Sequence, residues 1–117
     1  MLLTKNFKQN EFECKCGCGQ CDMDADFMDM LQQLRDAMGT ALYITSGYRC
    51  RAHNLNVGGS MRSFHLLGQA ADISVDQSGD RVNLVGHALR LGFNGIGIGK
   101  KFIHVDNRST QKVMWVY

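Results

Sequence analysis

The sequence contains no proline, so its turns depend on 13 glycines and on Asn and Asp residues. It also has no apolar stretch near the roughly 20 residues that a membrane-spanning helix needs. The apolar run within Met1–Lys5 is too short for a secretory signal peptide. A net charge of only +2 gives no reason to expect nucleic acid as a partner. We therefore expect a domain that is made in the cytoplasm and has no membrane span.

What the chain does contain fits one folded domain over residues 1–117, with an ordinary hydrophobic content of 44%. Residues 1–22 are rich in cysteine and glycine and are expected to form an irregular arm. Helices are predicted over Asp24–Met38, Arg51–Leu55 and Arg81–Leu91, and strands over Ala41–Ser46, Ala70–Val75, Gly95–Ile98, Phe102–Asp106 and Val113–Tyr117. These elements predict an α+β fold with two main helices and a small, mainly antiparallel sheet.

The first helix is the best supported of these elements. Its apolar residues recur at helical spacing, Asp22 or Asp24 can cap its start, and Gly39 follows its end. The glycine-rich stretch Gly95–Lys100 lacks the ending of a phosphate-binding loop, so we interpret it as part of a hairpin that turns at residues 99–101.

Three residues point to a metal site: His65, Asp72 seven positions later, and His104. Two imidazoles and one carboxylate are the ligand set of a catalytic zinc, which keeps its fourth position for water, whereas structural zinc usually takes four ligands and more sulfur. Asp72 is the strongest clue, because a carboxylate within an apolar strand costs free energy unless it is paired or binds a cation. Brought together in a cleft on the sheet, these residues would form the zinc site of a hydrolase.

Other interpretations of these residues stay open. Asp72 could face water on an edge strand, and a lone histidine such as His104 is often a hydrogen-bonded core residue. The same ligand set also holds ferrous iron in oxygenases. We prefer zinc, which serves as a Lewis acid and as a source of hydroxide near neutral pH.

Several short motifs follow one another along the chain, in the order Phe12–Gly19, Ser46-Gly47-Tyr48-Arg49, Asn54-x-x-Val57-Gly58-Gly59, His65 to Asp72, Gly95–Ile98 and Phe102–Asp106. Together they resemble the zinc D-alanyl-D-alanine carboxypeptidases and the related phage endolysin peptidases, in their small carboxypeptidase C-terminal-domain type. The vancomycin-resistance dipeptidases and the hedgehog signalling domain are more distant relatives of that family. The resemblance covers nearly the whole chain.

The resemblance implies that His65, Asp72 and His104 bind zinc, and that Arg49 contacts substrate or steadies developing negative charge. The reaction implied is hydrolysis of an amide bond in a peptidoglycan stem or cross-link peptide. An arginine fork suits a carboxylate or an oxyanion, although a structural salt bridge is the alternative for Arg49. We expect a monomer that acts at the bacterial cell wall after delivery by a route other than a signal peptide.

The general base is where this sequence departs from the family pattern. Many of these enzymes have an acidic residue three positions before the last histidine ligand, where this chain has Lys101. Asp106, on the same strand face as His104, is the nearest acidic substitute. It could accept a proton, or it could orient a ligand. A third alternative is a non-catalytic, zinc-stabilised module that binds wall peptides or a protein partner.

The chain has five cysteines, four of them in Cys14-x-Cys16-x-Cys18-x-x-Cys21 and the fifth at Cys50. An odd number is a poor disulfide framework. The cluster is also tighter than the usual paired zinc knuckles. A second, structural metal, a disulfide and free thiols near Cys50 all stay open at this point.

Overall fold

A five-stranded sheet organises the chain in the computed structural model, which describes all residues from 1 to 117. The strands lie in the order β3-β4-β6-β5-β7, and only the β5–β7 pair is parallel. Their bounds are β3 Tyr43–Ser46, β4 Ala70–Ser74, β5 Gly95–Ile98, β6 Phe102–Asp106 and β7 Val113–Val116. The predicted α+β fold with a mainly antiparallel sheet is therefore confirmed.

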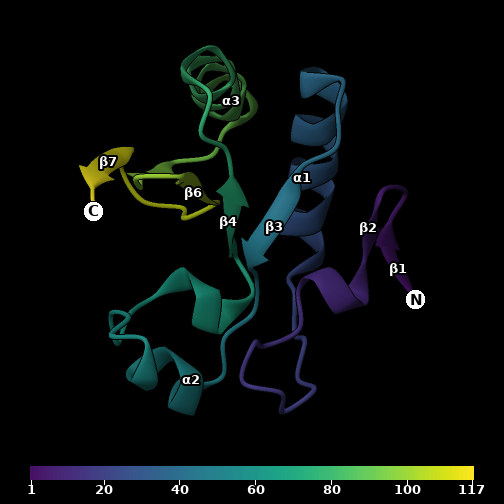
Figure 1. Cartoon of the computed structure of the whole chain (residues 1–117), viewed down its shortest axis with the longest axis vertical. Coiled ribbons are helices and arrows are strands. Elements are labelled where there is room, and N and C mark those ends of the chain that lie inside the picture. Colours follow the sequence, from purple (N-terminus) through teal and green to yellow (C-terminus); the bar gives the residue numbers. More distant parts are fainter.

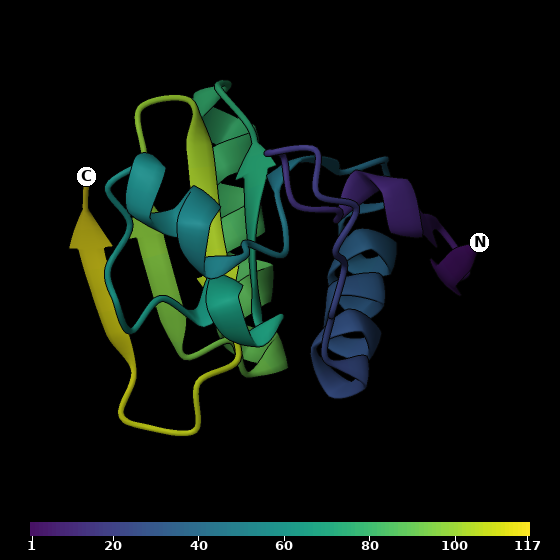
Figure 2. The same cartoon turned by 90° about the horizontal axis from the view of Figure 1, so that it is seen from below.

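Helices cover both faces of this sheet. The two long helices, α1 (Ala25–Met38) and α3 (Ser78–Leu91), contact each other and bury their apolar sides in the core. The short helix α2 (Arg51–Asn56) and the 3-10 helix η2 (Phe64–Leu67) lie on the opposite face of the sheet from α3 (Figures 1 and 2). None of the helices has the length and apolar character needed to cross a bilayer.

The alternation of side chains along the central strands separates core from site. Ala71 and Ile73 of β4, like Ile103 and Val105 of β6, belong to the cluster of 15 buried apolar residues. The residues between them, Asp72 and His104, point to the other face, because successive strand side chains alternate. The sheet thus buries its apolar face under α1 and α3 and presents its polar face toward α2 and η2.

The predicted helix ends are confirmed for α1 and differ for α3. The Asp24 carboxylate accepts a hydrogen bond from the Phe27 N–H at 2.9 Å, and Gly39 ends α1 with a φ of +70°. Helix α3 begins at Ser78, three residues before the predicted Arg81. Its first turn is exposed, so no apolar periodicity marks it in the sequence.

The arm over residues 1–22 is more ordered than expected. It starts with a hairpin of β1 (Leu2–Thr4) and β2 (Phe7–Lys8), followed by the 3-10 helix η1 (Gln9–Glu11). Phe7 and Phe12 are buried in the core and pack edge to face, with ring centroids 5.5 Å apart. Two buried rings in elements of two or three residues are too few to produce a periodic pattern.

Candidate metal centre

The sheet register brings the predicted ligands together. Asp72 of β4 lies directly opposite His104 of β6. His65 arrives from η2, whose start is capped by the Ser63 hydroxyl accepting from the His65 N–H at 3.2 Å. One donor atom from each of the three residues lies within 4.8 Å of the others, and all three side chains are buried.

The spacing of these atoms fits a metal ion. Asp72 Oδ1 lies 3.2 Å from His65 Nε2 and 3.1 Å from His104 Nδ1. A tetrahedral ion with ligands at about 2.0–2.1 Å holds two donors about 3.3–3.4 Å apart. The three donors can therefore hold one ion with little movement.

The outer nitrogens of both histidines already have partners. His65 Nδ1 lies 2.7 Å from the Gly47 carbonyl oxygen, and His104 Nε2 lies 2.7 Å from Asp106 Oδ2. With a metal bound, each outer nitrogen would donate its proton to that acceptor, and the lone pair of the inner nitrogen would face the ion. Metal-binding histidines are commonly held in one tautomer in this way.

Asp106 lies behind His104 and not in the open cleft. Its side chain is fully buried, and it accepts hydrogen bonds from Arg108 Nε at 2.8 Å and Nη2 at 2.7 Å. Burial would raise the pKa of Asp106, but the hydrogen bonds from Arg108 and His104 lower it to about 2. Asp106 is therefore an ionised acceptor that both of its neighbours engage.

The electrostatics of the pair at the centre favour a cation. Burial would raise the pKa of the Asp72 carboxyl, but hydrogen bonds with His104 and His65 hold that pKa well below its ordinary value. Burial lowers the pKa of His104, while its hydrogen bonds to Asp106 and Asp72 raise it above the ordinary value. The protein thus supplies negative charge at this point, which a metal ion would neutralise.

Arg49 lies beside the same carboxylate. Its guanidinium donates to Ser46 Oγ at 3.2 Å and to Asn54 Oδ1 at 3.3 Å, and Nη2 lies 3.5 Å from Asp72 Oδ2. Asn54 is buried and anchors its own amide on the Ser60 carbonyl at 2.9 Å. Asn54 thereby positions Arg49, a role that sequence reasoning did not assign to it.

An open cavity of about 740 Å³ lies over these residues. Asp72 is the only carboxylate among its 16 lining residues, which also include three arginines, Arg49, Arg62 and Arg108. Phe64, Trp115 and Tyr117 add aromatic walls, with the Arg108 guanidinium carbon 4.5 Å from the Phe64 ring centre and 5.2 Å from that of Trp115. The cavity therefore suits a ligand that carries both apolar groups and negative charge.

The part of this cavity that β7 supplies could not be predicted from the sequence. Trp115 lies opposite Gly97, and Gly97 lies opposite His104 on its other side. A Cβ on Gly97 would come within 2.7 Å of the Tyr117 ring and 2.8 Å of the Trp115 ring. The alternation of Trp115 and Tyr117 on one face was the available signal, but the parallel pairing of β5 with β7 is not visible in the sequence.

Gly95 leaves room for the side chain of Asp106, as Gly97 does for Trp115 and Tyr117. This close approach predicts a measurable effect of substitution. A Cβ at position 95 would overlap the Asp106 carboxylate. Gly95→Ala should therefore destabilise the fold by about 1–3 kcal/mol, the usual cost of overpacking, and weaken metal binding at His104. Chemical denaturation with and without metal measures both effects. Gly86→Ala on α3 is the control, because its added methyl meets nothing; equal stability of the two variants would contradict the explanation.

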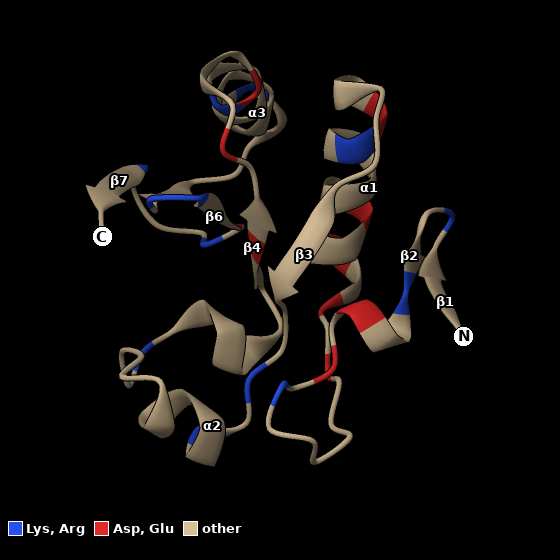
Figure 3. Cartoon of the chain, viewed as in Figure 1, with Lys and Arg blue, Asp and Glu red and all other residues tan.

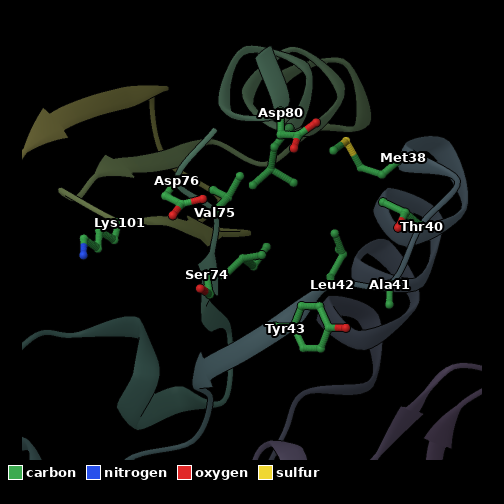
Figure 4. Close-up of a pocket in the computed structure, with 12 residues that line it drawn as sticks. Met38, Thr40, Ala41, Leu42, Tyr43, Ser74, Val75, Asp76, Asp80 and Lys101 are labelled. Carbon is green, nitrogen blue, oxygen red and sulfur yellow. The ribbon is translucent and has the colours of Figure 1, made fainter. Parts of the chain in front are cut away.

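Lys101 lies away from the metal centre. It lines a second cavity of about 400 Å³ between the end of α1 and the start of α3, together with residues such as Asp76 and Asp80 (Figure 4). That cavity contains none of the predicted site residues. Lys101 therefore lies outside the cavity over the metal centre.

The comparison with known families agrees with this geometry. A family model described as Peptidase M15 matches residues 5–106. The chain belongs to the M15 peptidase family. Members of this family depend on a metal, and in this M15 chain His65, Asp72 and His104 form one of two clusters able to hold an ion. No curated protein sequence matches the chain.

Proposed function

We propose that this M15 chain is a zinc-dependent peptidase that hydrolyses an amide bond in peptidoglycan stem or cross-link peptides. The observation that carries the proposal is the preorganised set of three inward donors, with both outer histidine nitrogens engaged, in an arginine-lined cavity. Stem peptides carry free carboxylates, and the arginines of the cavity suit such groups. The proposed site of action is accordingly the bacterial cell wall.

In this proposal each residue has one task. His65, Asp72 and His104 would hold zinc, which would act as a Lewis acid and lower the pKa of a bound water. Arg49 donates to the substrate, either to a terminal carboxylate or to the oxygen on which negative charge develops. The Ser46 hydroxyl and the Asn54 amide hold the Arg49 fork in place before substrate arrives. Such preorganisation lowers the cost of ordering the site.

We propose that Asp106 orients His104 and does not act as the general base. Its two oxygens are engaged by His104 and Arg108, and the side chain has no exposed surface. A base must reach the proton that it removes, directly or through one water. Arg108 continues the chain of contacts from His104 through Asp106 to the cavity wall.

Asp106→Asn tests this assignment. Loss of a carboxylate that orients a ligand should weaken zinc binding by about 10–100-fold. Turnover should then fall at limiting zinc and recover when zinc is saturating. The measurement is hydrolysis as a function of zinc concentration in a metal buffer. Turnover that stays 10²–10⁴-fold low, about the loss for a missing base, at saturating zinc would assign the base role to Asp106 instead.

A non-catalytic, zinc-stabilised binding module is the second candidate. The observation that favours it is the absence of any carboxylate other than Asp72 from the cavity lining. Such a module would bind wall peptides or a protein partner through the same arginines and aromatic rings.

Mass spectrometry of purified muropeptides separates the two candidates. After incubation with the zinc-loaded protein, a peptidase leaves fragments that differ by the mass of the released residue or peptide, and the fragments identify the broken bond. The control is the same incubation with Asp72→Asn, in which the central donor is lost. Intact muropeptides that nevertheless bind the protein, measured by calorimetry, would support the binding module.

A further inference from the structure

Four of the five cysteines converge on one point, away from the histidine site. The sulfur atoms of Cys14, Cys16, Cys18 and Cys50 all lie within 4.8 Å of one another. Three of their separations are 3.5 Å for Cys14–Cys16, 3.6 Å for Cys14–Cys50 and 3.7 Å for Cys16–Cys50. Cys21, the fourth cysteine of the sequence cluster, stands apart, with its thiol toward the Gln9 carbonyl at 3.7 Å.

These separations match a metal tetrahedron. Zinc binds thiolates at about 2.3 Å in tetrahedral geometry, which places any two sulfurs about 3.8 Å apart. A disulfide would instead bring one pair to about 2.0 Å and would leave the other sulfurs with no reason to converge. Three sulfurs at nearly equal distances, with a fourth close by, are the arrangement that one ion produces.

The backbone around the cluster is built to turn the cysteines inward. Gly17 and Gly19, which follow Cys16 and Cys18, have φ angles of +89° and +79° in otherwise open space. Only glycine adopts this conformation without strain. The backbone conformation, and not close packing, is therefore the reason for glycine at these two positions. They let closely spaced cysteines approach one point instead of standing along an extended strand.

Amide groups also point at the sulfurs. The Cys50 N–H donates to the Cys14 sulfur at 3.4 Å, and the His53 N–H at the start of α2 donates to the Cys50 sulfur at 3.4 Å. Hydrogen bonds to an ionised acceptor are stronger than those to a neutral one. Thiolate is the form of cysteine that binds metal, and both N–H donors would keep their partners when a metal binds.

We propose that Cys14, Cys16, Cys18 and Cys50 bind a second zinc ion, as a closed tetrathiolate site with a structural role. Four sulfur ligands leave no position for water or substrate, in contrast to the three donors of the histidine site. The sequence favoured no such set, because Cys50 lies 36 residues from Cys14 and replaces the nearby Cys21.

The position of this site links it to Arg49. Cys50 follows Arg49 directly, and the Tyr48 N–H donates to the Phe12 carbonyl at 2.9 Å, so two contacts join the arm to this segment. Figure 1 shows the arm before α1 beside the chain that leads from β3 into α2. An ion bound by both segments would fix the position of the segment that carries Arg49, whose side chain lines the cavity.

The zinc content of single variants tests the proposal. Protein purified without chelator and loaded with zinc should hold two ions per chain, and Cys18→Ser should hold one. Cys21→Ser is the matched control and should keep two, because its sulfur lies outside the cluster. Asp72→Asn should also hold one ion, but from the other site, so failure at either site is recognised separately. A single ion per chain that survives Cys18→Ser would overturn the tetrathiolate site.

Cobalt substitution gives a second, independent readout. Cobalt at the cysteines should show an intense sulfur-to-metal charge-transfer band in the wild type and in Asp72→Asn, and this band should be lost in Cys18→Ser. If Cys18→Ser does not fold, titration of the thiols of Cys21→Ser with a mercurial should release one zinc per four thiols consumed. An intact mass two hydrogens below the reduced chain, with no charge-transfer band, would show a disulfide and overturn the proposal.

Discussion

Asp72→Asn is expected to remove metal from the histidine site and to reduce hydrolysis to background. The asparagine amide keeps the shape of the side chain but carries no charge, and Asp72 Oδ1 is the one atom within hydrogen-bond distance of both His65 and His104. Zinc at about 1,000 times its Kd stabilises a native site by about 4 kcal/mol. The variant should lose most of that increment. Thermal unfolding with zinc and with chelator, compared between the wild type and Asp72→Asn, measures the loss, because any contribution of the cysteine cluster is common to both proteins.

The control for this prediction is Asp76→Asn, an exposed aspartate four residues further along. It should keep both the zinc-dependent stability and the activity. Comparing the chelated forms separates loss of metal from damage to the fold, since Asp72 also pairs with Arg49. Full activity and an unchanged zinc increment in Asp72→Asn would contradict the assignment of the site.

Arg49→Lys is expected to lower kcat/KM by about 10²–10³-fold, the usual effect of removing one donor to an oxyanion. Lysine keeps the positive charge but carries its three N–H donors on one nitrogen, so it cannot span Ser46, Asn54 and a substrate oxygen as the planar guanidinium does. Zinc content should be unchanged, because Arg49 supplies no ligand. Steady-state hydrolysis of the muropeptide that the wild type cleaves measures the effect.

Arg51→Lys, an exposed arginine two residues away at the start of α2, is the matched control and should be neutral. If Arg49→Lys and Arg51→Lys hydrolyse substrate equally fast, the role of Arg49 is structural. If Arg49→Lys instead loses zinc, the ion pair with Asp72 supports the metal site and not the substrate.

Most of the secondary structure could be predicted because it depends on local patterns. Helix α1 carries its apolar stripe, its Asp24 cap and its terminal Gly39 within 16 consecutive residues, and all three appear in the structure. The first turn of α3 and the hairpin of residues 2–8 were missed. The former is fully exposed, and the latter consists of strands of two and three residues, so neither has a periodic signal.

The candidate ligands could be predicted from motif and chemistry, whereas their surroundings could not. The sequence alone shows that Asp72, like His104, is a polar residue within an otherwise apolar strand. The sequence marks Arg108 only as one of several basic residues, although its side chain pairs with Asp106 and lines the cavity. Acidic residues gather along α1 and the segment before it, whereas basic residues are spread over loops, helices and a strand (Figure 3).

By itself, the sequence determined which residue types were available and which face of each strand they occupy, since alternation follows from the pleat of the backbone. Only the tertiary structure decided the pairings: Asp72 opposite His104, Trp115 beside Gly97, and Cys50 in place of Cys21 among the sulfurs. Each of these depends on register or on closure of a loop, which is set by the packing of distant segments. Asp106 likewise contacts Arg108 and His104 and does not face the open cleft. A role as proton acceptor, one of the two roles predicted for Asp106, would require it to face that cleft.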